Sequence, residues 1–565
     1  MSVVTLATPR RSDHVWGLAL AIGWTSILAA TSHDVGIPRD ESFYFQAADR
    51  AAWWFESLGR ADVASFEPDA IRRGFQYNRE HPVLMKSLFG LSHRFLHEKW
   101  GLVDDPILAY RLPTMVMAGL SLWLAWLLGI IAANRMVAFV AVLALCAMPR
   151  LFFHSHLACF DGPVTFMWLF GVYTYVRAMR AVKWAPMVGV AIGFGFATKL
   201  NIFFLPFTLL LVACLDVLGY RRRTGRWWGP KDARSPLFYA GAIALSIIVI
   251  GGFVFWVHWP WLYFDTIPHL REYVAFHARH EHYPVDFLGT LLIKPPFPVT
   301  YPWVMLVLTV PVATLVLGAV GLAQIGKRAW LDWRTDDGAD RRQLELTLLL
   351  NFLVPICIIA LPNTPIFGGT KHWMPAMPFL AIGVGFGAQV VTRGLWPSLS
   401  GRLHGAIAGV MLLPAVWATA EYGTQGPVYY NALAGGPPGA ASLGMPRNFW
   451  GYSTNAILPA VNAETEQRAY VFWHKATRGA IDAYKAAGQL RQDVRYTGDW
   501  TAAYSDWAVY HDQHEKMPEE LDVWRAYGTP WPVDGHFVDG IQMVALYRRR
   551  PAPPKKNAKS ITGGD

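Results

Sequence analysis

The chain changes direction at the stretch Ile37-Pro38-Arg39-Asp40-Glu41-Ser42-Phe43-Tyr44, which follows its first long apolar run. Beyond this stretch, apolar residues recur at intervals of three and four, so it joins the end of one predicted helix to the start of another. Two adjacent carboxylates, Asp40 and Glu41, stand at the junction. Acids are favoured at a helix N-terminus, where they cap free N–H groups and meet the positive end of the helix dipole. The local sequence alone favours capping, and a general base is the alternative that the rest of the chain has to support.

The composition predicts a membrane protein. Of the 565 residues, 53% are hydrophobic and only 16% are charged, whereas about a quarter of the residues in soluble domains are charged. The net charge of +10 does not indicate nucleic-acid binding, because Lys and Arg gather in short loops between apolar runs. Eleven runs are candidate membrane spans: 15–32, 108–131, 136–149, 163–179, 184–200, 201–219, 236–257, 302–325, 344–361, 373–391 and 404–421.

The distribution of positive charge predicts the orientation of these spans. With the N-terminus inside, every inner loop carries Lys or Arg, as the positive-inside rule requires. The outer face then receives the long segments rich in aromatic residues and histidines: 33–107, 150–162, 258–301, 362–372 and everything after 421. We therefore expect the functional residues on the outer face.

The outer segments have structure of their own. The first outer segment contains two apolar stripes, one from Phe43 to Leu58 and one beginning after His81-Pro82. They predict two helices lying in the membrane surface. Lys86, His93 and His97 are expected on the second helix's water-facing side. After residue 421, runs such as 469–473, 507–510 and 542–547 predict strands. The predicted fold is thus mainly α, with about eleven transmembrane helices in residues 1–421, a small extracytoplasmic α/β domain in 422–550 and a disordered tail in 551–565.

Several polar residues of the outer face are candidates for a site. Asp161 precedes a Gly-Pro pair at a predicted helix start, where capping is the alternative, and Lys199 ends a span, where snorkelling is the alternative. The segment Gly368-Gly369-Thr370-Lys371-His372 leads into another helix, an arrangement that suits a phosphate because free N–H groups and a cation meet there. A basic flank of a membrane helix is the alternative. Together these acids and cations fit a substrate linked to a lipid phosphate.

The outer loop 258–301 contains a group of histidines. His277, His280 and His282 are weak candidates for a metal site, because their spacing matches no strong motif. The alternative is an interfacial helix with histidines at the headgroup boundary. We predict no certain cofactor; a divalent metal is a possibility, since paired acids can recruit one.

The order of these features resembles a known family. An Asp-Glu pair follows the first span, surface helices with a His-Pro-x-Leu start come next, Tyr110-Arg111-Leu112-Pro113 leads into a span, and Phe160-Asp161-Gly162-Pro163 opens another. This order resembles the GT-C glycosyltransferases of the protein O-mannosyltransferase and lipid A aminoarabinose transferase type (glycosyltransferase family 39), in a bacterial form without a β-trefoil domain. Pro82-Val83-Leu84 departs from the usual Pro-Pro-Leu and loosens the alignment near Lys86.

The resemblance implies roles for individual residues. It implies a multi-pass inner-membrane enzyme that transfers a sugar, with inversion, from a polyprenyl-phosphate donor to a lipid, glycan or protein acceptor on the outer face. We expect Asp40 to act as general base, with Glu41 and Asp161 as further catalytic residues. We expect the donor phosphate to be bound by Lys86, Arg111, Lys199, Lys371 and His372. The residues expected in the acceptor groove are Tyr44, Tyr77 and His81.

Two other functions fit less well. A transporter or flippase of lipid-linked glycans would need charges within the spans and a repeated half-structure, and the sequence shows no internal repeat. A non-catalytic scaffold would not need both outer acids.

Overall fold

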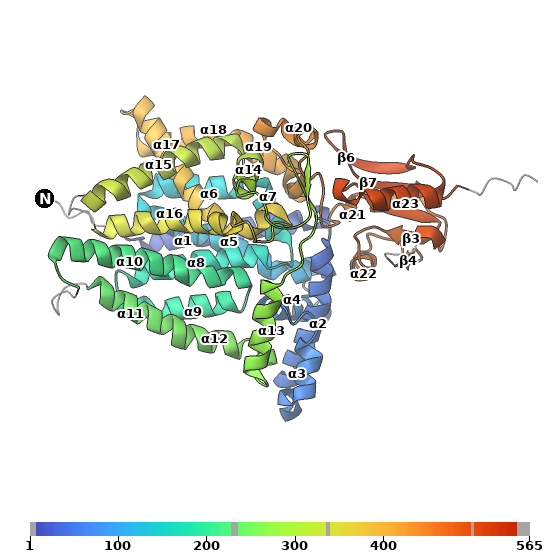
Figure 1. Cartoon of the computed structure of the whole chain (residues 1–565), viewed down its shortest axis with the longest axis horizontal. Helices are drawn as coiled ribbons and strands as arrows, with labels where there is room; N and C mark the ends of the chain where they lie inside the picture. Colours follow the sequence, from blue (N-terminus) through green and yellow to red (C-terminus); the bar gives the residue numbers. More distant parts are fainter. Residues whose placement is uncertain (1–6, 61, 228–234, 335–338, 499–501, 551–565) are drawn as a thin grey trace, which may run out of the picture.

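The computed structural model describes residues 7–60, 62–227, 235–334, 339–498 and 502–550. The predicted tail, 551–565, lies outside this range. Figure 1 shows a long bundle of helices, a group of helices lying across one end of it, and a sheet-containing unit beyond that end.

Each of the eleven predicted spans coincides with a helix or a pair of helices. In chain order these are α1 (Arg11–Ala30), α5 (Pro106–Ala132), α6 (Arg135–Cys146) with α7 (Pro149–His156), α8 (Asp161–Ala178), α9 (Ala185–Phe196), α10 (Phe204–Thr224), α11 (Pro236–Ser246) with α12 (Gly252–Val257), α14 (Tyr301–Thr309) with α15 (Val312–Arg334), α16 (Ala339–Ile359), α17 (Met377–Leu395) and α18 (Gly401–Met411) with α19 (Leu413–Tyr422). Among the described residues, six helices are long and apolar enough to cross a membrane, or eight if two bent pairs each count as one span. The chain is therefore a mainly helical, multi-pass membrane protein, and the number eleven stays a prediction.

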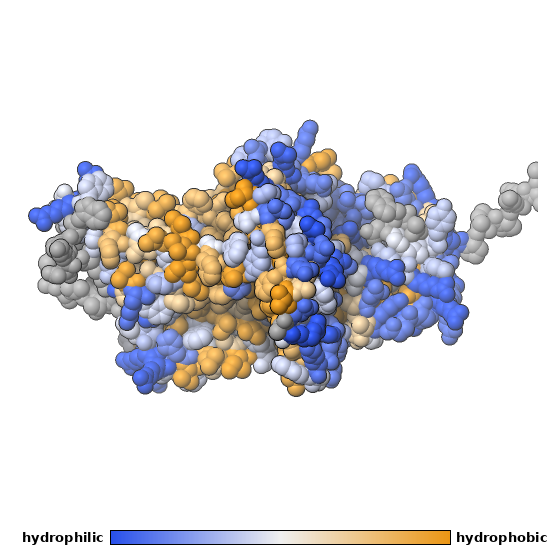
Figure 2. Space-filling model, turned by 90° about the horizontal axis from the view of Figure 1, so that it is seen from below, coloured by the Kyte–Doolittle hydropathy of each residue, from blue (hydrophilic) through white to orange (hydrophobic). Residues whose placement is uncertain are grey.

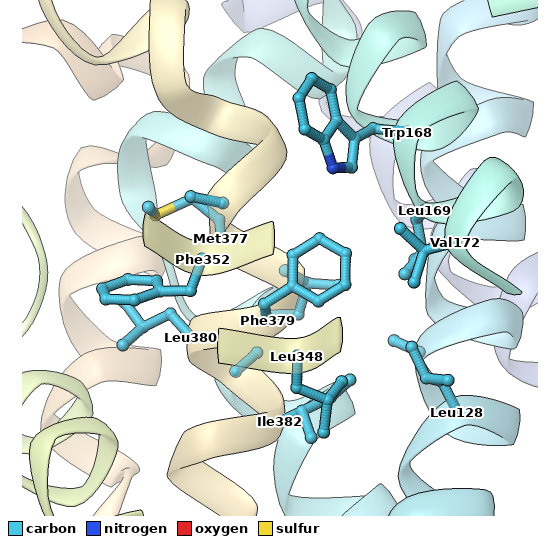
Figure 3. Close-up of a cluster of buried hydrophobic side chains, with 14 of the residues drawn as sticks. Leu128, Trp168, Leu169, Val172, Leu348, Phe352, Met377, Phe379, Leu380 and Ile382 are labelled. Atoms are coloured by element: carbon cyan, nitrogen blue, oxygen red, sulfur yellow. The ribbon is translucent and has the colours of Figure 1, made fainter. Parts of the chain in front are cut away.

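The bundle has an apolar exterior and a packed interior. Its outer surface forms an apolar belt between two hydrophilic ends (Figure 2), as expected of helices surrounded by lipid. Inside, side chains of α5, α8, α16 and α17 meet in one buried cluster that includes Leu128, Trp168, Phe352 and Phe379 (Figure 3).

Glycines allow two of the bundle helices to approach closely. A Cβ added to Gly321 of α15 would lie 1.8 Å from the carbonyl oxygen of Gly383, and one added to Gly387 of α17 would lie 1.8 Å from that of Leu317. No other residue fits at these two points. Small residues at a helix contact replace the hydrophobic driving force that is absent between helices in lipid.

The first outer segment forms helices that lie across the end of the bundle. They are α2 (Arg39–Gly59), α3 (Pro68–Phe75) and α4 (Leu84–Ser92), joined farther along the chain by α13 (Thr266–Ala278). The two predicted surface helices are thus present. The prediction that Lys86 and His93 of the second helix face water is wrong. Lys86 is 2% exposed and His93 is 9% exposed, because α4 is packed between α2 and α5.

The C-terminal segment folds around a five-stranded sheet in the order β4-β3-β5-β7-β6. The strands are β3 (Tyr470–Trp473), β4 (Arg495–Thr497), β5 (Trp507–His511), β6 (Asp534–Val538) and β7 (Ile541–Arg548), and the three predicted runs correspond to β3, β5 and β7. β3 is parallel to β4 and β5, whereas β7 is antiparallel to β5 and β6. The sheet is accompanied by α21 (Thr454–Glu464), α22 (Arg478–Ala486) and α23 (Met517–Tyr527). Because successive strand residues point to opposite faces, Val471 and Val509 join one buried cluster while Phe472 and Tyr510 join another.

Candidate active site

Asp40 lies in the first turn of α2 and is not its cap. The N-cap residue is Pro38, whose side chain makes no capping hydrogen bond. The Asp40 side chain is 38% exposed, so it remains accessible. The structure therefore removes capping as the explanation for this acid.

Two cavities meet at Asp40. One, of about 430 Å³, extends between bundle helices and is called the bundle cavity; the other, of about 900 Å³, is covered by the C-terminal unit and is called the domain cavity. Both are lined by Asp40, Tyr44, His81, His280, Phe367, Lys371 and Trp450. A substrate in either cavity can thus reach the same carboxylate.

The bundle cavity combines cations with an apolar wall. Lys199 Nζ lies 2.5 Å from Asp161 Oδ1, and Lys371 Nζ lies 4.0 Å from Asp40 Oδ2. His372 also lines this cavity, and its Nε2 lies 2.5 Å from the Phe367 carbonyl oxygen. The apolar lining comes from Trp168, Leu200, Phe204, Ile358, Ile359 and Leu361. The structure brings together the predicted residues Asp40, Asp161, Lys199, Lys371 and His372.

Glu41 faces away from both cavities. Its carboxylate accepts two hydrogen bonds from Arg111, at 2.8 and 2.7 Å, and a third from the Ala158 N–H at 2.7 Å. Arg111 also donates to the carbonyls of Ser32, Val35 and Gly36. Both side chains are fully buried. This corrects two sequence-based roles: Glu41 and Arg111 fix the backbone that carries Asp40, and neither lines a cavity.

Lys86 and Tyr77 also lie outside the two cavities. The Lys86 ammonium donates to the carbonyls of Asn78 and His81, at 2.6 and 2.8 Å, and burial lowers its pKa to about 7. It therefore holds the turn before α4 and does not face a donor phosphate as expected. Tyr77 lies under the Arg50 guanidinium, 4.5 Å from ring centroid to Cζ, at a separate hollow of the surface.

The predicted groove residues Tyr44 and His81 do line both cavities. Burial lowers the pKa of His81 well below its ordinary value, so the ring is neutral at pH 7. Its Nδ1 is buried and has no hydrogen-bond partner among the residues that the structure describes. This nitrogen is free to bond a substrate hydroxyl.

The three candidate metal histidines do not form a metal site. His277 Nε2 lies 3.1 Å from the Glu80 carbonyl oxygen, and His280 stacks on Phe367. His282 packs against Phe297. Among the described residues, no group of three or more His, Cys, Asp or Glu side chains is arranged to hold a metal ion.

The C-terminal unit contacts the loop that carries Asp40. Tyr484 accepts a hydrogen bond from the Ile37 N–H at 2.7 Å, and the Thr477 hydroxyl lies 2.7 Å from that of Ser42. The Arg39 N–H donates to the Trp450 carbonyl at 2.8 Å. The loop is therefore held from the bundle by Arg111 and from the outside by these contacts.

Trp450 is a site residue that the sequence did not indicate. Its φ of +74° lies in the left-handed region, which is a strained conformation for a bulky residue. The Lys371 ammonium lies 4.1 Å from its ring centroid. An aromatic face that holds a cation in this way positions Lys371 beside Asp40. No periodicity or motif distinguishes Trp450 from the other 25 tryptophans of the chain.

Comparison with known protein families gives a match to one part of the chain. The family described as dolichyl-phosphate-mannose-protein mannosyltransferase matches residues 99–256, a range that contains Arg111, Asp161 and Lys199. Over this segment the chain is similar to the protein mannosyltransferases. The match supports the resemblance seen in the sequence for this part of the chain. No curated protein is a significant match.

Several solved structures are also similar to this one at low sequence identity. ArnT from Cupriavidus metallidurans bound to undecaprenyl phosphate is 15% identical, with 94% of this chain and 98% of that chain covered and a TM-score of 0.46. The oligosaccharyltransferase of Archaeoglobus fulgidus is 12% identical, with coverages of 88% and 69% and a TM-score of 0.48. The arabinosyltransferase EmbB from Mycobacterium smegmatis is 15% identical, with coverages of 74% and 43% and a TM-score of 0.29.

Proposed function

We propose that this enzyme transfers a sugar from a polyprenyl-phosphate donor to a hydroxyl-bearing acceptor on the outer face of the inner membrane, with inversion. One observation carries the proposal: Asp40 stands where an apolar cavity with cations meets a larger cavity lined by polar and aromatic residues. The donor class accords with the dolichyl-phosphate-mannose enzymes that the matching family comprises.

The donor fits the bundle cavity by its chemistry. Its phosphate would contact Lys199, Lys371 and His372, while its prenyl chain would lie along the apolar wall formed by residues such as Phe204 and Ile359. Cations placed where negative charge develops stabilise a departing phosphate. Asp161 holds Lys199 through its ion pair and acts on the phosphate through it.

The reaction is a single displacement. An acceptor hydroxyl in the domain cavity attacks the anomeric carbon as Asp40 takes its proton. A bond forms between the acceptor oxygen and the anomeric carbon, and the bond from that carbon to the phosphate oxygen breaks. The electron pair leaves on the phosphate, beside the lysines. Tyr44 and His81, at the boundary of the two cavities, would contact the sugar.

The proposal includes an orientation. We place the end of the bundle that carries α2, α4 and the C-terminal unit outside, with eleven spans and the N-terminus inside. The basis is the positive charge at the opposite end of the bundle, such as Arg221, Arg222 and Arg223 in the last turn of α10. Cysteine accessibility to an impermeant reagent in intact cells, at position 488 against position 402, tests it.

The decisive experiment measures transfer directly. Purified full-length protein is incubated with radiolabelled polyprenyl-phosphate sugars and a membrane extract, and the label is followed into lipid, glycan and protein fractions. Transfer by the wild type that is absent in Asp40→Asn supports the proposal. An Asp40→Asn protein with normal turnover would contradict it.

A further inference from the structure

The cations around the two cavities are not equally neutralised. Lys199 is paired with Asp161 and Lys371 with Asp40, while Lys475 and Lys516 share Glu519. Arg150 differs from them. Within the described part of the chain, no carboxylate oxygen lies within 4.0 Å of its guanidinium. Its hydrogen bonds, from Nε and Nη2, both end on the neutral carbonyl of Tyr429, at 3.3 and 3.2 Å.

Arg150 is nevertheless buried. It lies in the first turn of α7, is 8% exposed, and its Cζ stands 4.9 Å from the Tyr430 ring centroid. Taking a charge out of water is expensive unless an opposite charge compensates for it, so buried arginines are normally paired. The planar fork of N–H donors matches a carboxylate or a phosphate. A buried arginine on a cavity wall without an acid is therefore prepared for an anion that arrives with a substrate.

The wall beside Arg150 leaves room for that anion. Arg150, Tyr301 and Gly369 all line the domain cavity. A Cβ added to Gly369 would lie 3.7 Å from Arg150 Nη1 and 4.0 Å from the Tyr301 hydroxyl. Since Gly369 has a φ of +58° and no side chain, this space between the guanidinium and the hydroxyl stays open.

We propose that Arg150 and the Tyr301 hydroxyl bind an anionic group, a phosphate or a carboxylate, carried by the acceptor in addition to its attacking hydroxyl. The assignment rests on the proposed function. It is made to the acceptor and not to the donor because Arg150 lines the domain cavity alone, whereas Lys199 and His372 line the bundle cavity. The neighbouring Lys371 belongs to both cavities, so an anchored acceptor lies next to Asp40.

The experiment uses the full-length enzyme, a radiolabelled polyprenyl-phosphate sugar and a membrane extract as the source of acceptor. The labelled product is separated from the donor and applied to an anion exchanger at pH 7, before and after phosphatase treatment or carboxylate esterification. The apparent KM is measured separately for donor and extract in Arg150→Gln, Arg150→Lys and Tyr301→Phe. Arg447→Gln is the matched control, because Arg447 is paired with Asp512 and lines neither cavity.

The inference predicts a product that binds the exchanger and loses this retention after one of the two treatments, which identifies phosphate or carboxylate. In Arg150→Gln the apparent KM for extract should rise about tenfold or more, as for a lost charge-assisted contact. The KM for donor should change less than about twofold. Arg150→Lys should recover part of the loss, and Tyr301→Phe, which changes no charge, should show a smaller rise.

A neutral product, or an unchanged KM for extract in both Arg150→Gln and Tyr301→Phe, would overturn the inference and leave the proposed function standing. A rise confined to the donor KM would also overturn it, since Arg150 would then belong to the donor site. If the wild type transfers no label from any donor, the proposed function and this inference fall together. Melting temperatures of all variants show whether a loss reflects unfolding.

Discussion

Glu41 and Arg111 form a fully buried, bidentate ion pair with distances of 2.8 and 2.7 Å, one residue along the chain from the exposed Asp40. Of the two adjacent acids, Glu41 is thus held in a structural ion pair, while Asp40 stays accessible. Arg111 connects α5 to three carbonyls of the segment 32–36 and to the Glu41 carboxylate of α2, which fixes the corner of the chain where Asp40 stands.

Breaking this pair should unfold the corner. Glu41→Gln leaves the Arg111 charge buried and unpaired, and we expect the free energy of unfolding to fall by about 3–5 kcal/mol. Arg111→Gln should have a similar effect from the other side. Thermal melts of the detergent-purified variants measure it.

The double variant Glu41→Gln/Arg111→Gln separates charge from shape. Removing both charges should restore more than half of the stability lost in either single variant, because no unpaired charge remains. Additive losses in the double variant would show that the two side chains do not act as a pair.

Asp40→Asn is expected to behave in the opposite way. It removes the proposed base while keeping the shape, so transfer should fall by about a hundredfold to ten-thousandfold, with a melting temperature within about 2 °C of the wild type. The side chain is partly exposed and contacts Lys371 only at 4.0 Å, which is why little stability is at stake. Initial rates with a radiolabelled donor measure the loss, and Arg447→Gln serves as the control for substitution near the cavity.

Lys371 should act on the donor. Lys371→Gln removes a cation from the boundary of the two cavities, and we expect the KM for a polyprenyl-phosphate sugar to rise about tenfold, as for a hydrogen bond to a charged group. Trp450→Leu, which removes the aromatic face 4.1 Å from the ammonium, should give a smaller rise in the same direction. A fall in kcat alone, with the donor KM unchanged in Lys371→Gln, would contradict a binding role.

How much of this could be predicted from the sequence depends on the distance over which each feature is encoded. Spans, strands and the acids at helix starts are local patterns. Asp40, Asp161, Lys199, Lys371 and His372, which line the bundle cavity, were predicted as site residues on that basis. Lys86 was misassigned because periodicity shows only that it lies opposite an apolar stripe. It does not show that both sides of α4 are buried, against α2 and α5. Its two carbonyl partners, Asn78 and His81, belong to an irregular turn.

Contacts over long sequence distances could not be predicted. Tyr484 and Ile37 are 447 residues apart and meet only because the C-terminal unit is seated on the loop that leads into α2. Arg150 was overlooked for a related reason. The absence of an acid beside it is a property of the folded cavity and leaves no pattern in a chain that has 50 Lys and Arg residues.

The contact between Tyr484 and Ile37 gives a prediction about the loop. Tyr484→Phe leaves the Ile37 N–H buried without a partner, at an expected loss of about 1–3 kcal/mol, and the loss should be concentrated in the loop. Hydrogen exchange of peptides covering residues 33–45 should become faster, and transfer should fall several-fold through kcat. Tyr527→Phe is the matched control, since Tyr527 is also a buried tyrosine of the C-terminal unit and lies in α23, away from this loop. Equal exchange in the loop of both variants would contradict a positioning role for Tyr484.

The last prediction concerns pH and the C-terminal unit. Burial lowers the pKa of His474 to about 4 and that of His511 to about 3, below the value of about 6.5 in an unfolded chain. Both folded rings are therefore neutral between pH 4 and 6.5, while the unfolded chain takes up protons in that window. The stability that they contribute is complete above pH 6.5 and is lost as the pH falls towards 4.

At pH 5 each of these histidines should reduce the free energy of unfolding by on the order of 2 kcal/mol relative to pH 7.5. The His474 pair with Glu519 at 3.0 Å does not reverse this trend, because the depressed pKa of Glu519 makes its own contribution fall at still lower pH. We expect the melting temperature of the full-length enzyme to decline between pH 7 and 5, and less steeply in His511→Asn, where one of the two titrating rings is absent. Equal slopes in the wild type and in His511→Asn would show that the His511 ring accepts a proton in the folded state as readily as in the unfolded chain.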